Sequence, residues 1–311
     1  MTTKPIIRQI AASVAFVLAA VLVAVIWRNW YRPVMRPGPN LATTQFGLPA
    51  PTAGLRLHVF NTSMNRMSWF VVGDVRPWRP NPVFVIEHPA QGLVVFDTGL
   101  SQQVTEDGGF SVRFLMESVA RRDRMIDEQM RIAGLDPTAV KFVIISHLHG
   151  DHTGRISAFA NAEVIAGPST EAALEQLAPN ARRRTIDFGP GAALPPFGAS
   201  IDLFRDGSVT LVPGGGHTKE DLIALVALPA GPALLAGDAI VHRDWLNSDD
   251  VQKIPVDPDR AAEVRNQVRA LVRGVPNIAL FPGHDTPPEV RRDDIEIHDR
   301  DWFEFSAWAG K

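Results

Sequence analysis

The residues best suited to chemistry lie in one short stretch that places three histidines and one aspartate within six positions. The stretch reads His147, Leu148, His149, Gly150, Asp151 and His152. Imidazole nitrogens and carboxylate oxygens are ligands that suit zinc and related divalent metals. Packing alone gives no reason to put three imidazoles and a carboxylate in one loop, so the sequence predicts a metal site here.

Three further candidate ligands follow, each in a short loop after an apolar run. They are His217, Asp238 and His284. Seven ligands are too many for one tetrahedral ion, but they suit two ions that share a bridging carboxylate. The sequence therefore favours a dinuclear centre over a single ion.

Strands and helices alternate along the part of the chain that must position these ligands, which indicates an α/β fold. Periodic or continuous apolar runs predict strands at 55–60, 83–87, 93–96, 142–145, 201–204, 209–212, 223–228, 233–235 and 278–281. Predicted helices cover 125–133, a segment capped by Ser169 that ends at Leu177, and a segment that begins at Asp257-Pro258 and ends at Gly274. Asp136-Pro137 is expected to begin one further short helical turn.

The order of the ligand motifs, H-x-H-x-D-H followed by His, Asp and His, resembles the metallo-β-lactamase superfamily over roughly residues 55–290. Phe96-Asp97-Thr98-Gly99 falls where that superfamily carries a buried Asp close to the metal loop. Within the superfamily the chain resembles the N-acyl homoserine lactonase branch, in the stretches 86–89, 133–137, 146–149 and 281–285. The resemblance implies a four-layer αβ/βα sandwich with the metals at one edge, between two sheets.

The resemblance also implies which residues would hold the metals. The first ion would take His147, His149 and His217, the second would take Asp151, His152 and His284, and Asp238 would bridge the two. Zinc is the expected ion, while iron, manganese or cobalt would fit the same ligands. The implied reaction is hydrolysis of an ester or lactone by a metal-bridging hydroxide, with N-acyl homoserine lactones as the best named substrates. Asp151 would orient the hydroxide and pass a proton to the leaving alkoxide.

One departure from the branch leaves other substrates open. Lactonases of this branch commonly place a Tyr three residues after the bridging Asp, where this chain has Val241, and its single tyrosine is Tyr31. His242 or Trp245 could substitute. The alternatives are a hydrolase of the same fold that acts on a thioester, phosphoester or β-lactam, and a non-catalytic membrane-anchored binding protein.

Several residues near the motifs have two readings. Asp97 could orient a metal-ligating imidazole, or it could simply belong to an Asp-Thr-Gly turn. His58 and His298 are expected to be structural, because neither is part of a ligand motif. His88 is expected to be structural because it precedes Pro89 in the hairpin predicted between the strands at 83–87 and 93–96. An apolar group could form an acyl-chain pocket or pack in the core; its members are Met64, Met67, Trp69, Phe70 and Trp78.

The N-terminal part of the chain predicts a membrane attachment. Residues 10–27 carry no charge and are nearly all apolar, and as a helix they would span about 27 Å. A retained single-pass anchor is favoured over a cleaved signal peptide, with the catalytic domain on the outer, periplasmic side. Residues 1–9 would form a short tail, 28–54 a Pro-rich tether and 55–311 the hydrolase domain. The net charge is −3 without a basic stripe, which disfavours nucleic acid as a partner and leaves a small-molecule ester or lactone.

Overall fold

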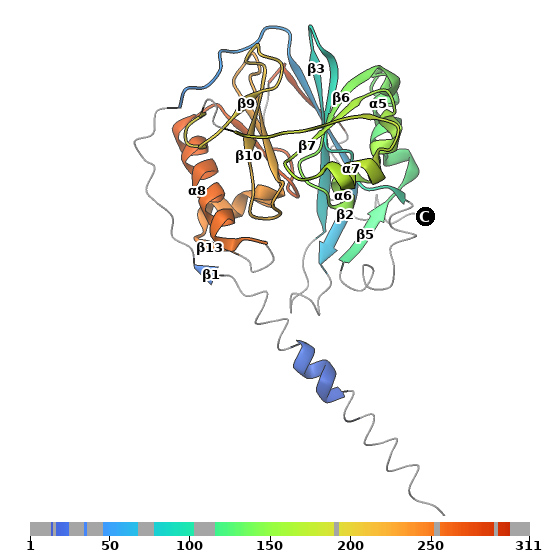
Figure 1. Ribbon diagram of the computed structural model, residues 1–311, viewed down its shortest axis with the longest axis vertical. Helices are drawn as coiled ribbons and strands as arrows, with labels where there is room; N and C mark the ends of the chain where they lie inside the picture. The colour runs from blue at the N-terminus through green and yellow to red at the C-terminus, as the bar shows by residue number, and fades with distance from the viewer. Residues whose placement is uncertain are drawn as a thin grey trace, which may run out of the picture.

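The molecule is built around two β-sheets that face each other, with helices on their outer faces (Figure 1). The computed structural model describes residues 14, 17–24, 34–35, 46–67, 78–102, 116–189, 193–251, 256–288 and 292–298. The predicted four-layer αβ/βα arrangement is confirmed for this part of the chain, because each sheet has one face toward the other sheet and one face under helices.

The larger sheet contains eight strands. Its order is β15 (Ile295–Ile297), β2 (Arg56–Met67), β3 (Arg79–His88), β4 (Gly92–Phe96), β6 (Val140–Ile144), β7 (Glu163–Ala166) and β8 (Arg182–Thr185), and β5 (Met116–Ala120) pairs with β2 outside this path. Strands β3 and β4 form the predicted antiparallel hairpin, whereas β4, β6, β7 and β8 run parallel.

The smaller sheet contains five strands. Its order is β14 (Ala279–Pro282), β12 (Ala233–Gly237), β11 (Leu222–Val226), β10 (Val209–Pro213) and β9 (Ile201–Asp202). A separate pair joins β1 (Val34–Met35) to β13 (Asp250–Val251). Strands β12 and β14 are parallel neighbours, so the loops that follow them leave the sheet at the same edge.

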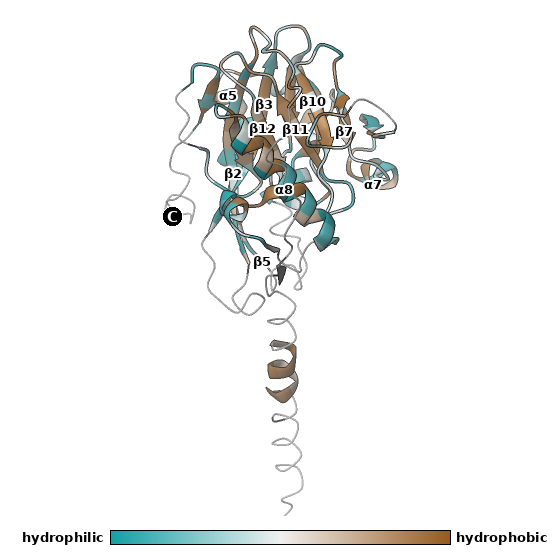
Figure 2. Ribbon diagram, turned by 90° about the vertical axis from the view of Figure 1, so that its left-hand side faces the viewer, coloured by the Kyte–Doolittle hydropathy of each residue, from teal (hydrophilic) through white to brown (hydrophobic). Residues whose placement is uncertain are grey.

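Successive side chains of a strand point to opposite faces of the sheet, so every second residue enters the core between the two sheets. Leu57 and Val59 of β2 point inward and meet Leu211 and Ala224 of the opposite sheet, while Phe60 points outward. The outer face of the larger sheet packs on α5 (Ile126–Ile132) and α7 (Glu171–Leu177). Helix α8 (Pro258–Gly274) covers the smaller sheet, and the apolar colouring of the strands beneath it is visible in Figure 2.

Helix ends show where local sequence rules succeeded and failed. Asp257 caps α8 as predicted, because its side chain accepts a hydrogen bond from the backbone N–H of Arg260. Asp136 likewise caps the 3₁₀ helix Pro137–Ala139. The predicted Ser169 cap of α7 is wrong: Ser169 has a φ of 61°, and Thr170 takes the cap position.

The predicted membrane anchor is not supported. Of residues 10–27, the described ones are Val14 and 17–24, which are helical and exposed; the others lie outside the described residues. Among the described segments, no helix combines the length and the apolar character needed to cross a bilayer. The prediction of a single-pass membrane protein with an outer catalytic domain is therefore corrected. The subdivision into tail, tether and hydrolase domain stays a prediction, although Phe46 and Leu48 from the predicted tether pack against the core around α8.

Candidate dinuclear metal centre

All seven predicted ligands lie in loops or short helices directly after strands. His147 and His149 follow β6, and the helix α6 (Gly150–Thr153) holds Asp151 and His152. His217, Asp238 and His284 follow β10, β12 and β14 of the opposite sheet. Because these strands end at one edge of the two-sheet core, residues up to 137 positions apart converge there.

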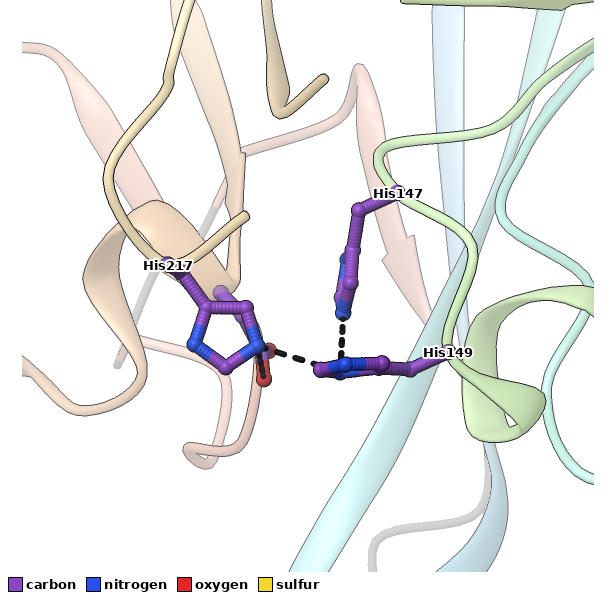
Figure 3. A group of neighbouring side chains, drawn as sticks. His147, His149 and His217 are labelled. Carbon is purple, nitrogen blue, oxygen red and sulfur yellow. Dashed lines mark hydrogen bonds and ion pairs between the residues drawn. The ribbon is translucent and has the colours of Figure 1, made fainter. Parts of the chain in front are cut away.

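The first ligand group consists of three imidazoles and one carboxylate. His147 Nε2 lies 2.9 Å from His149 Nδ1, and His217 Nε2 lies 3.1 Å from the same nitrogen (Figure 3). The carboxylate Oδ2 of Asp238 lies 3.4 Å from His217 Nε2. Two ligands on one tetrahedral zinc ion lie about 3.3 Å apart, so this spacing fits a shared ion.

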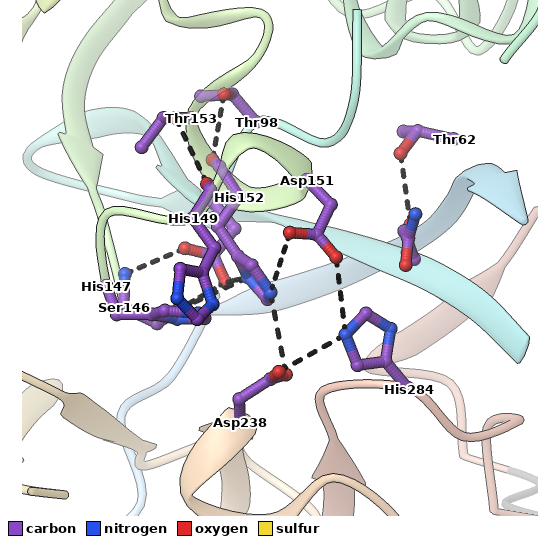
Figure 4. A network of polar contacts seen from close by, with 12 residues as sticks. Thr62, Thr98, Ser146, His147, His149, Asp151, His152, Thr153, Asp238 and His284 are labelled. Atoms are coloured by element: carbon purple, nitrogen blue, oxygen red, sulfur yellow. Dashed lines mark hydrogen bonds and ion pairs between the residues drawn. The ribbon is translucent and has the colours of Figure 1, made fainter. Parts of the chain in front are cut away.

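The second group shares the same carboxylate. His284 Nε2 lies 3.3 Å from Asp238 Oδ2 and 3.4 Å from Asp151 Oδ2. His152 Nε2 lies 3.5 Å from Asp238 Oδ1 and 3.9 Å from Asp151 Oδ1 (Figure 4). Asp238 thus contacts residues of both groups, as a bridging ligand would.

Two buried polar atoms at this point have no hydrogen-bond partner among the described residues. They are His152 Nε2 and Asp238 Oδ1, which face each other. Leaving such atoms buried and unsatisfied is costly, and a divalent ion between them would remove that cost. The donor set and these two orphaned atoms therefore fit a centre for two divalent metal ions.

The remaining ring nitrogens are held by neighbours, which fixes the direction of the lone pairs. His152 Nδ1 lies 2.8 Å from Asp97 Oδ2, and His284 Nδ1 lies 3.1 Å from the backbone oxygen of Pro80. When these nitrogens donate, each Nε2 that gives up its proton to an incoming metal ion directs its lone pair into the site. This arrangement holds the imidazoles in a metal-binding orientation.

Charge differs between the two groups. Burial lowers the pKa of His147 well below its usual value, and burial lowers the pKa of His217 to about 4, so both are neutral at pH 7. Burial raises the pKa of Asp238, but the charges of His284 and His152 outweigh it and hold the pKa well below its ordinary value. The carboxylate therefore stays anionic, as a metal ligand must.

The carboxylate-rich half of the site surrounds His152. Burial lowers the pKa of His152, but Asp97, Asp151 and Asp238 together outweigh it and raise the pKa well above its usual value. Three carboxylates around one imidazole form a strongly negative pocket. A divalent cation is the natural partner for such a pocket.

Asp97 combines both roles that the sequence left open. Its backbone has a φ of 62°, in the left-handed region, at the start of the Asp-Thr-Gly turn. Its carboxylate accepts hydrogen bonds from the backbone N–H and the hydroxyl of Ser146, at 2.7 and 2.8 Å, and contacts His152. The turn and the orientation of the imidazole are thus properties of one residue.

Sequence reasoning missed Asn65 and Gly283. Asn65 Nδ2 donates to Asp151 Oδ2 at 2.8 Å and to Asn81 Oδ1 at 3.1 Å. No local signal links Asn65 to Asp151, which lies 86 residues away. A Cβ at Gly283 would lie 2.1 Å from Asp238 Oδ1, so only glycine fits there. The Pro-Gly-His motif was a signal for this close approach.

His242, one of the two proposed substitutes for the missing tyrosine, lies between two carboxylates. His242 Nδ1 and Nε2 each lie 3.3 Å from a carboxylate oxygen, of Asp244 and of Asp285 respectively. Among the apolar pocket candidates, Met64 is buried within β2, and Trp78 lies beneath the guanidinium of Arg66 at 4.7 Å. Trp69 and Phe70 lie outside the described residues.

Comparisons with known proteins agree with this geometry. Residues 76–284 match the family model of the metallo-beta-lactamase superfamily. The N-acyl homoserine lactonase AttM of Azorhizobium caulinodans is 34% identical over 210 residues, which cover 63% of this chain and 76% of that protein. The AttM protein of Agrobacterium fabrum is 33% identical over 178 residues, which cover 53% of this chain and 66% of that protein.

Solved structures show the same fold. A variant of B. thuringiensis AiiA with N-decanoyl-L-homoserine bound at the active site has a TM-score of 0.61 at 20% identity, covering 76% of this chain and 94% of that one. An N-acyl homoserine lactone hydrolase with N-hexanoyl-L-homoserine bound at its catalytic metal center has a TM-score of 0.60 at 21% identity, covering 76% and 94%. The chain therefore belongs to the metallo-β-lactamase superfamily, as a metal-dependent hydrolase of the lactonase branch.

Proposed function

We propose that this protein hydrolyses the ester bond of N-acyl homoserine lactones and opens their ring. The observation that carries the proposal is the position of the Asp238 carboxylate between two groups of ligands, which fits the paired metals of a hydrolase. The similarity to AttM, and to structures that hold N-acyl homoserines at the active site, supports this substrate class.

The proposed ligand assignment uses both groups. One ion would be held by His147, His149 and His217, the other by Asp151, His152 and His284, and Asp238 would contribute to both. When bound, zinc ions lower the pKa of a coordinated water and polarise the ester carbonyl. The neutral rings of His147 and His217 and the fixed Nε2 atoms of His152 and His284 suit this assignment.

The reaction adds one water molecule across the ester C–O bond. The water oxygen bonds to the carbonyl carbon, the ring C–O bond breaks, and the released oxygen takes up a proton, which gives an N-acyl homoserine. Asp151 is the proposed group that accepts the proton of the water and delivers it to the leaving oxygen. Asn65 holds one of its carboxylate oxygens at 2.8 Å and so limits the rotation of the side chain.

A second substrate class is favoured by one observation at the same site. Val241 occupies the position three residues after Asp238, so no phenol at that position steadies the carbonyl or the leaving oxygen. A substrate with a less basic leaving group, such as the thiolate of a thioester or the phenolate of an aryl phosphoester, has less need of that assistance. Hydrolysis of such a bond is therefore the alternative.

The test is a hydrolysis assay on the full chain loaded with zinc. Short- and long-chain N-acyl homoserine lactones, a thioester and a phosphodiester are compared, with His147→Ala as the variant that removes one proposed ligand. Ring opening that disappears in His147→Ala supports the proposal. A folded, zinc-replete protein that cleaves the thioester or phosphodiester and leaves the lactones intact would sink it.

A further inference from the structure

A second cluster of side chains that could bind a metal lies on the outer face of the larger sheet, which points away from the smaller sheet. Strand β15 pairs with β2 so that Glu296 lies directly opposite His58, and His298 follows two residues later. The backbone N–H of His298 donates to the carbonyl of Val59 and so continues this alignment. Because Leu57 and Val59 point into the core between the sheets, His58 and Glu296 point to the outer face.

The cluster has the spacing of a metal site. His58 Nδ1 lies 3.0 Å from His298 Nε2 and 3.5 Å from Glu296 Oε2. His298 Nε2 lies 3.8 Å from Glu296 Oε1. The proposed catalytic ligands cover a similar range, from 2.9 Å between His147 Nε2 and His149 Nδ1 to 3.9 Å between His152 Nε2 and Asp151 Oδ1. Ligands that share one ion at about 2.0–2.1 Å lie roughly 3–3.4 Å apart.

The rings of both histidines are oriented by neighbours. His58 Nε2 lies 2.6 Å from Glu87 Oε1, so this nitrogen is the donor and Nδ1 keeps the lone pair that faces the cluster. Phe60 stacks on the His298 ring, with centroids 4.3 Å apart and planes 3° from parallel. The carboxylate–imidazole pair of Glu87 and His58 repeats the relation between Asp97 and His152 in the catalytic centre.

Burial and charge are compatible with an ion that enters from solvent. His58 is 4% exposed, whereas the side chain of Glu296 is 51% exposed, so the cluster is open on one side. Burial lowers the pKa of His298, which leaves its ring neutral at pH 7. Arg56 lies 3.5 Å from Glu296 Oε2 and competes with a cation for that oxygen.

We propose that His58, Glu296 and His298 form a third metal site for zinc or another divalent ion that prefers imidazole, such as nickel or cobalt. Glu87 orients His58 without touching the ion. The site joins β15 to β2, so an ion there would fasten the last described strand of the chain to the sheet. This proposal is independent of the substrate of the catalytic centre.

The experiment measures bound zinc per chain after equilibrium dialysis of the full-length protein, by atomic emission. The expected result is three zinc ions in the wild type and two in His298→Ala and in Glu296→Gln. Glu263→Gln, which alters an exposed glutamate of α8, is the matched control and should keep three. The hydrolase activity of Glu296→Gln should equal that of the wild type.

Two results would overturn the proposal. One is a wild-type protein that saturates at two ions, which would show that the cluster is only a chain of hydrogen bonds. The other is a third ion that persists in both ligand variants. If His298→Ala fails to fold, Glu296→Gln decides the question, because its half-exposed side chain is dispensable for packing. The zinc counts decide the question even if lactone hydrolysis is absent.

Discussion

Asp97 shows how one residue can serve both the backbone and the metal centre. Its φ of 62° is unfavourable for most residues but is tolerated by Asp and Asn. Asp97→Asn therefore keeps the turn and removes the carboxylate that faces His152 and Ser146. This separates the two roles that the sequence could not distinguish.

We expect Asp97→Asn to lower zinc affinity by roughly 10- to 100-fold, because a carboxylate that holds a metal-binding histidine in place contributes that much to metal binding. The free energy of unfolding of the metal-free protein should fall by less than the free energy of zinc binding. Zinc competition with a chromophoric chelator and urea titration measure the two quantities. Unchanged zinc affinity would mean that Asp97 matters for the turn alone.

Gly283 is required by the close approach of Asp238. A methyl group at this position would lie 2.1 Å from Asp238 Oδ1 and 2.8 Å from the backbone of Gly237. Gly283→Ala should displace the carboxylate of Asp238, the proposed bridging ligand, lower activity roughly tenfold and cost about 1–3 kcal/mol of stability. Gly189→Ala is the control, because nothing lies within 4 Å of its added Cβ. Equal activity in the two variants would contradict the placement of Asp238.

At the scale of elements, one ion pair ties α5 to the end of the metal loop. Arg155 Nε and Nη2 each lie 2.8 Å from a carboxylate oxygen of Asp127, and the backbone N–H of Arg155 donates to the hydroxyl of Thr98. Burial raises the pKa of Asp127, but Arg155 outweighs it and holds the pKa below its usual value. The helix and the loop are thus joined by a charged contact.

We expect Asp127→Asn to cost about 2 kcal/mol at pH 7, measured by urea unfolding of the metal-free protein. A carboxyl whose pKa is lower in the folded state stabilises the fold above its unfolded pKa of 3.8. That contribution disappears as the pH falls through the still lower folded value. The difference between variant and wild type should therefore shrink below pH 4, whereas Asp123→Asn, at an exposed pair, should show little difference throughout. A difference that is independent of pH would refute the charge-based explanation.

At the scale of the whole molecule, the proposed metal ligands come from both sheets. The larger sheet supplies four of these residues in the loop and short helix after β6: His147, His149, Asp151 and His152. The smaller sheet supplies the other three after its strands: His217, Asp238 and His284. Metal ions shared between these residues would cross-link the sandwich at its edge. Stability should therefore depend on metal.

Removal of the metals with a chelator should lower the melting temperature, and added zinc should restore it. Zinc at a hundredfold excess over its dissociation constant stabilises the folded state by about 2.7 kcal/mol per site. Differential scanning fluorimetry of the wild type and His147→Ala measures this effect. The idea of a cross-link fails if the chelator abolishes activity but leaves the melting temperature of the wild type unchanged.

The sequence by itself determined the ligand types, their order and the strands that deliver them. Apolar runs before His147, Asp238 and His284 predicted β6, β12 and β14, because buried strands require continuous apolar residues. Asp257-Pro258 predicted the start of α8, because its capping chemistry is local. Two strands at the margins of the sheet were missed: β8 reads Arg-Arg-Arg-Thr and has no apolar period, and the alternation of β15, Ile-Glu-Ile, is only three residues long.

Only the tertiary structure decided which distant residues meet. His58 and His298 lie 240 residues apart and were expected to be structural, yet the parallel pairing of β15 with β2 brings their ring nitrogens within 3.0 Å. Asn65 reaches Asp151 in the same way, across 86 residues. At residues 10–27 the sequence instead predicted a feature that the structure does not support: hydropathy alone predicted a membrane-spanning helix, and no described helix is long and apolar enough to be one. Local patterns report backbone preference and burial, whereas strand register sets which side chains come into contact across the fold.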